Sequence, residues 1–128
     1  MDRALLVGAA LTAASAFLAW TQVSRTAIVP CGLVAGILVG ATGRPMDNGL
    51  LRGAKAGALG AVLFVTTIAV VGGYRYRVVS TGYAIDWSLF TWFSMSVMVL
   101  PLFTLEGGVA APAAAWVRRF VARVRRQR

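Results

Sequence analysis

The chain has 128 residues, of which 59% are hydrophobic and 13% charged, with thirteen Lys and Arg against four Asp and Glu. Soluble domains carry about 25% charged residues, and a chain this short has a large surface for its volume, so lipid must cover much of it. This composition excludes intrinsic disorder and argues against an ordinary cytosolic enzyme. It predicts an all-α integral membrane protein.

Four apolar stretches predict four transmembrane helices, at about residues 4–22, 26–42, 50–72 and 87–106. The fourth contains 19 residues without a charge, about 28 Å of helix, which matches a hydrocarbon core of about 30 Å. The third stretch has a similar apolar length if the long side chains of Arg52 and Lys55, near its start, extend to the headgroup region. We therefore expect a transmembrane domain over residues 1–108 and a tail over residues 109–128.

The first stretch permits a second interpretation. Arg3, the apolar run and the small residues 14–16 resemble a secretory signal with a cleavage site. However, Asp2 weakens the basic start, and the apolar run continues past the site to Trp20. An uncleaved first span is favoured, with cleavage as the alternative.

The chain lacks the side chains that several kinds of metal and haem site require. The chain has no His, and Cys31 is its only cysteine, so Cys/His zinc sites, di-iron sites and haem ligation by His lack their ligands. We expect no catalytic residue, cofactor or metal, and no enzymatic activity. Cys31 itself is either a small apolar residue at a helix start or a thiol that cross-links two copies.

Glycine spacing is the strongest pattern in the second and third spans. Glycines that recur every three or four residues form a strip along one side of each helix, where backbones can approach closely. The helix-packing glycines are Gly32, Gly36, Gly40, Gly49, Gly53, Gly57 and Gly60. The short connection 42–48 makes these spans neighbours, so the pattern predicts a glycine zipper between them; alternatively, a strip faces a second copy in a homo-oligomer.

Pro30 before a glycine-spaced helix, a short loop, and then a Gly-xxx-Gly-xxx-Gly-xx-Gly helix resemble small haloarchaeal membrane proteins that form a family of unknown function. The likeness covers residues 28–61, under a third of the chain. It implies four spans and supplies no catalytic residues.

Charge distribution predicts the orientation. With four spans both termini lie on one side, together with ten of the thirteen cations; the three others are Arg25, Arg75 and Arg77. Positive charge favours the cytoplasm, so a multi-pass protein of the cell membrane with both termini cytoplasmic is expected. The loop 74–86 on the other side predicts either a small β-hairpin or an irregular connection.

Pro101 and Glu106 bear on the shape and the chemistry of the fourth span. Pro101 predicts a kink. Glu106 closes the span, either as a boundary residue paired with Arg or, if the helix continues through Val117, as a deeper proton or cation site.

The tail predicts a separate basic amphipathic helix, because Gly107-Gly108 and Pro112 favour a break before it. It could lie on anionic lipid headgroups, while specific recognition of nucleic acid is not expected from so short a segment. An acidic partner protein is an alternative. The residues assigned to lipid or partner contact are Trp116, Arg118, Arg119, Phe120, Arg123, Arg125 and Arg126.

Together these features favour a small non-enzymatic membrane protein that acts as a structural or accessory component through helix packing. Two alternatives remain open. One is a holin-like pore former of a virus, and the other is a small transporter or channel subunit that uses Glu106.

Overall fold

The computed structural model describes residues 3–42 and 49–127, and these are almost entirely helical. The short hairpin consists of α1 (Arg3–Leu18), a π-helical turn η1 (Ala19–Val23), a 3₁₀ helix η2 (Arg25–Cys31) and α2 (Gly32–Thr42). The long hairpin consists of α3 (Gly49–Tyr76) and α4 (Thr81–Arg126). Predictions about the connection 43–48, including Arg44, and about residues 1, 2 and 128 lie outside the described residues.

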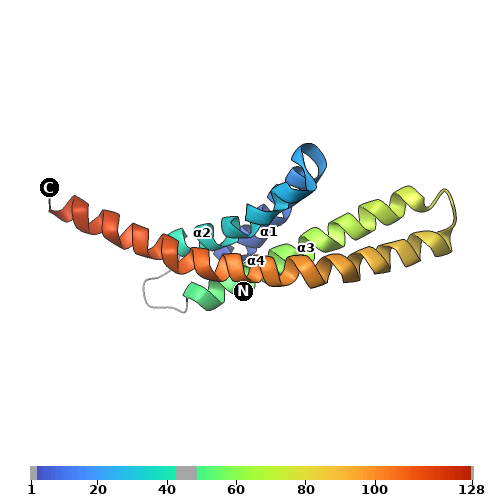
Figure 1. Cartoon of the computed structure of the whole chain (residues 1–128). Coiled ribbons are helices and arrows are strands. Elements are labelled where there is room, and N and C mark those ends of the chain that lie inside the picture. The colour runs from blue at the N-terminus through green and yellow to red at the C-terminus, as the bar shows by residue number, and fades with distance from the viewer. Residues whose placement is uncertain (1–2, 43–48, 128) are drawn as a thin grey trace.

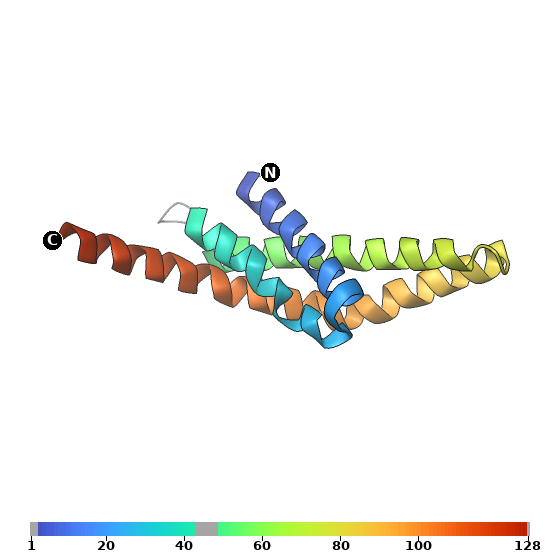
Figure 2. The ribbon, with the colours of Figure 1, turned by 90° about the horizontal axis from the view of Figure 1, so that it is seen from above.

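Four helical segments are long and apolar enough to cross a membrane, as predicted: Arg3–Val23, Arg25–Thr42, Gly49–Tyr76 and Thr81–Arg126. Their lengths are unequal. The first two have 21 and 18 residues, about 27–32 Å, whereas α3 has 28, about 42 Å, and α4 has 46, about 69 Å. The short hairpin crosses the long one at an angle, and the long hairpin extends past it at both ends (Figures 1 and 2).

The turn of the long hairpin is tighter than predicted. Helix α3 continues to Tyr76 and α4 begins at Thr81, so the expected loop 74–86 is largely helical, without the β-hairpin. The Ser80 hydroxyl accepts a hydrogen bond from the Tyr83 N–H at 3.0 Å and caps α4. Tyr76 packs on Tyr83 and Trp87, with ring centroids 5.6 and 5.1 Å apart, and these contacts hold the helix ends together.

Helix α4 is unbroken from Thr81 to Arg126, so the predicted break at Gly107-Gly108 and Pro112 is wrong. Residues 109–126 do not form a separate helix but continue the fourth span: residues 109–114 still pack on α2 and α3, and the rest extends beyond the bundle (Figure 1). Figure 2 shows a bend in the orange middle of α4, the region that contains Pro101.

The core lies where the two hairpins cross. The Phe64 ring of α3 stacks on Phe103 of α4 at 6.2 Å and meets the edge of Trp20 at 6.4 Å. Both Phe side chains are fully buried, and Ala16 and Ile28 of the short hairpin pack against the same cluster. These contacts fix how far along α3 the short hairpin reaches.

Candidate functional site

The glycines of α2 face α4. A Cβ added to Gly36 would lie 2.6 Å from both the Ala110 Cβ and the Gly107 carbonyl oxygen, and one added to Gly40 would lie 2.8 Å from the Ala114 Cβ. A Cβ on Gly32 would collide with α4 as well, at Phe103 and Glu106. No side chain fits at these positions, so they set how closely α2 approaches α4.

Two glycines of α3 face the same helix from the other side. A Cβ on Gly53 would lie 2.5 Å from the Ala111 Cβ, and one on Gly57 would lie 2.8 Å from the Phe103 carbonyl carbon. Gly60 instead faces α1, where its Cβ would meet the Thr12 Cγ2 at 2.8 Å. Gly49 has only ordinary packing space.

The predicted glycine positions therefore lie at helix contacts, but the predicted partner is wrong. The strips of α2 and α3 do not face each other: the α2 glycines and Gly53 and Gly57 of α3 face α4, while Gly60 faces α1. Gly107 of α4 completes the contact: a Cβ there would come within 3.3 Å of the Gly57 Cα and collide with the Gly53 backbone. This packing offsets the cost of about 1 kcal/mol for a helical glycine and explains why α4 does not break there.

The glycine contacts within one chain limit the surfaces through which two copies could associate. Because α4 and α1 of the same chain cover these glycines, a second copy would have to use another surface. Cys31 is buried against the core cluster, and its Sγ lies 3.5 Å from the Ala27 carbonyl oxygen, as expected of a small apolar residue.

Glu106 lies between α4 and the start of α2. Its Oε2 lies against the backbone of Gly32, so that a Cβ on Gly32 would collide with it. Its Oε2 is buried and has no partner among the described residues, so the expected pairing with Arg is not found. The neighbouring contacts of Gly57 with Phe103 and of Gly53 with Gly107 place Glu106 level with Lys55, near the end of the apolar part of α3.

The basic end of α4 projects past the start of α3. Trp116 and Phe120 stack at 5.8 Å, yet their side chains are 67% and 56% exposed. Arg118 donates a hydrogen bond to the Ala41 carbonyl oxygen at 3.0 Å, which fastens the helix to the end of α2. The predicted lipid or partner contacts therefore lie on a helical arm, residues 115–126, that extends α4.

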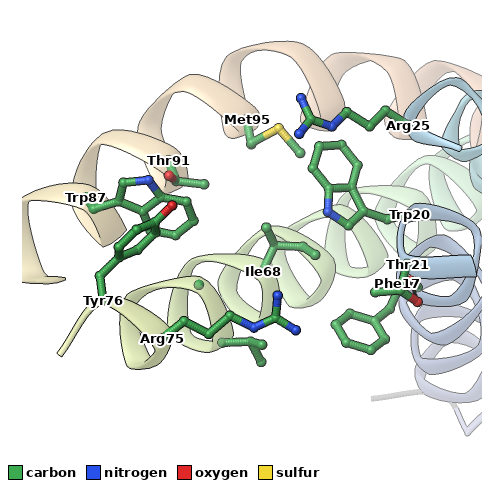
Figure 3. A pocket seen from close by; sticks show the side chains of 12 residues that line it. Phe17, Trp20, Thr21, Arg25, Ile68, Arg75, Tyr76, Trp87, Thr91 and Met95 are labelled. Atoms are coloured by element: carbon green, nitrogen blue, oxygen red, sulfur yellow. Dashed lines mark hydrogen bonds between the residues drawn. The ribbon is translucent and has the colours of Figure 1, made fainter. Parts of the chain in front are cut away.

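Sequence reasoning missed a cavity of about 550 Å³ above the tip of the short hairpin. Arg25 enters it from the tip, where its guanidinium lies 5.3 Å from the Trp20 ring, and Arg75 enters from α3. Figure 3 shows the Arg25 guanidinium beside Trp20 and Met95, and the Arg75 guanidinium on the other side of Ile68, toward Phe17. Among the residues that the structure describes, no acidic side chain lines it. We call this space the notch.

The sequence signal for this cavity is weak, because Arg25 and Arg75 indicate only positive charge on one side of the membrane. Both side chains line one cavity because the hairpins cross and have unequal lengths. Comparisons with protein families, curated proteins and solved structures find no match to this chain. The resemblance to haloarchaeal proteins stays a prediction.

Proposed function

We propose that this chain is a non-enzymatic accessory membrane protein whose helix packing holds the basic arm of α4 at the cytoplasmic surface, on anionic lipid headgroups. The observation that carries the proposal is the single 46-residue helix α4, clamped by glycines from both α2 and α3. A bilayer core needs only about 20 residues. The excess length therefore serves to present the arm.

The reach of the arm suits a membrane surface. Beyond the Arg118 hydrogen bond only residues 119–126 continue, about 12 Å of helix. This is close to the screening length of about 10 Å at 0.1 M salt, so the arginines stay within electrostatic range of headgroups. The exposed Trp116 and Phe120 rings supply an apolar contact at the same place. The excess of cations at this end of the chain supports the cytoplasmic orientation.

The test uses the full chain in nanodiscs of neutral or anionic lipid, with a spin label at Val121. We expect anionic lipid to reduce the accessibility of the label to a water-soluble relaxation agent at 0.1 M salt, and 1 M salt to erase the difference. Replacing Arg123, Arg125 and Arg126 with Gln should also erase it. Equal accessibility in both lipids would contradict the proposed lipid contact.

The alternatives make separate predictions. Reproducible turnover of a substrate by purified protein would contradict the non-enzymatic role. A holin-like pore would release dye abruptly and halt growth when expression is induced. A transport role for Glu106 would show as an ion flux that Glu106→Gln removes.

A further inference from the structure

The notch lies at the level of a membrane surface. On α3, Arg75 lies 20 positions after Lys55, about 30 Å along the helix, which is close to the thickness of a hydrocarbon core. When Lys55 lies at one boundary, Arg75 lies at the other. The aromatic residues Trp20, Tyr76 and Trp87 surround the notch, as expected at headgroup level.

The notch has two chemically distinct parts. The guanidinium groups of Arg25 and Arg75 supply two positive charges, with the hydroxyl groups of Thr21 and Thr91 nearby in the lining. The remaining wall is apolar and includes Phe17, Ile68, Val71 and Met95. A fitting ligand therefore carries negative charge at one end and hydrocarbon at the other.

We propose that the notch binds one anionic phospholipid from the leaflet at the hairpin tips. Its phosphate would lie between Arg25 and Arg75, and part of one acyl chain would lie along Ile68 and Met95. Arginine donates paired, charge-assisted hydrogen bonds to phosphate. The volume of about 550 Å³ suits a headgroup and part of a chain.

Lipid is favoured over other occupants by charge and by position. Arg25 and Arg75 are both exposed, and no acid is found among the described residues of the lining, so their positive charge is left to be neutralised by an anion. The notch lies between the tip of the short hairpin and the last third of α3, from Ile68 to Tyr76, and phospholipid is the anion that a membrane supplies at this level. The inference concerns the end of the bundle opposite the arm and is independent of the proposed arm function.

Native mass spectrometry of the full chain in detergent provides the test, with phosphatidylglycerol and phosphatidylcholine of identical acyl chains as probes. We expect one phosphatidylglycerol to be retained at least tenfold more tightly than phosphatidylcholine. Arg25→Gln and Arg75→Gln should each weaken phosphatidylglycerol binding about tenfold and leave phosphatidylcholine binding nearly unchanged. Arg77→Gln is the matched control, because Arg77 lies on the Tyr74 ring, 3.9 Å from its centroid, and outside the notch.

Further measurements distinguish the possible ligands. Met95→Ser should weaken binding of both lipids, since it removes acyl contact only. Glycerol phosphate should not displace the lipid at equal concentration; full displacement would assign the notch to a soluble anion and overturn the lipid proposal. Equal retention of both lipids, or an Arg77→Gln effect as large as those of the notch variants, would also overturn it. If a Gln variant fails to fold, Arg75→Lys keeps the charge, loses the paired donors and should bind several-fold more weakly.

Discussion

The two hairpins contribute different surfaces to the molecule because they differ in length. The short hairpin spans about one hydrocarbon thickness and contributes its glycines and Trp20 to contacts inside the bundle. The long hairpin exceeds that thickness at both ends: its turn passes the tip of the short hairpin, and α4 continues past the start of α3 (Figure 2). The notch and the arm both arise from this excess. The length difference, more than any local motif, therefore creates both surfaces proposed to bind lipid.

The largest expected effect is on the contact within the long hairpin. Gly57→Ile should lower the free energy of unfolding by about 3 kcal/mol or more, because the branched side chain collides with the Phe103 backbone. Equilibrium unfolding in detergent measures this loss. Gly82→Ala is the matched control: no atom lies within 4 Å of its added Cβ, so stability should stay equal or rise by up to about 1 kcal/mol.

The same glycine variant tests self-association. If the strip faces only α4, cross-linking in membranes should give the same pattern of species for Gly57→Ile as for wild type. A shift from dimer to monomer would mean that a second copy uses this side of α3.

A second comparison concerns how much the tip of the short hairpin and the arm each contribute to stability. Trp20→Ala should cost about 2 to 3 kcal/mol, less than a fully buried Trp, because Trp20 packs on Phe64 but is only half-buried. Trp116→Ala should change stability by less than about 0.5 kcal/mol, since that side chain is mostly exposed. Thermal unfolding of both variants would settle the difference; comparable losses would mean that the arm packs on the bundle.

A smaller effect is expected from hydrogen bonds in the long hairpin. The Ser88 hydroxyl donates to the Ala69 carbonyl oxygen at 3.0 Å and links α4 to α3. Ser88→Ala should cost about 0.5 to 1 kcal/mol. The Thr67 hydroxyl bonds only within α3, so Thr67→Ala should cost less; the reverse order of unfolding free energies would contradict the assignment.

The smallest effect concerns the attachment of the arm. Arg118→Ala should speed hydrogen exchange in residues 115–126 without changing global stability, because it removes the bond to the Ala41 carbonyl oxygen. Arg125→Ala is the control and should leave exchange unchanged. Equal protection in the two variants would mean that the Arg118 bond does not order the arm.

Much of the fold was predictable because apolar length is a local property of the sequence. Four stretches long enough to span a membrane appear at the predicted places, and the glycines lie at helix contacts. What the glycines contact was not predictable, since the direction of a strip depends on rotation about the helix axis. The short connection between α2 and α3 indicated neighbours but not that both would turn toward α4.

The errors in α4 have one physical cause. Gly107, Gly108 and Pro112 disfavour a helix locally, and sequence reasoning placed a break there. Tertiary packing overrides this preference, because Gly107 allows the backbone of α3 to approach. The notch was missed for a related reason: Arg25 and Arg75 are 50 positions apart, and only the crossing of the hairpins brings them together.

The continuity of α4 is the central claim, and a distance between spin labels at Leu105 and Val124 tests it most directly. Both side chains are exposed, and the pair brackets Gly107-Gly108 and Pro112. An unbroken helix predicts one narrow distribution near about 28 Å between the two Cα atoms. A broad distribution, or a main peak several ångströms shorter, would mean that the chain breaks after the fourth span and would contradict the account.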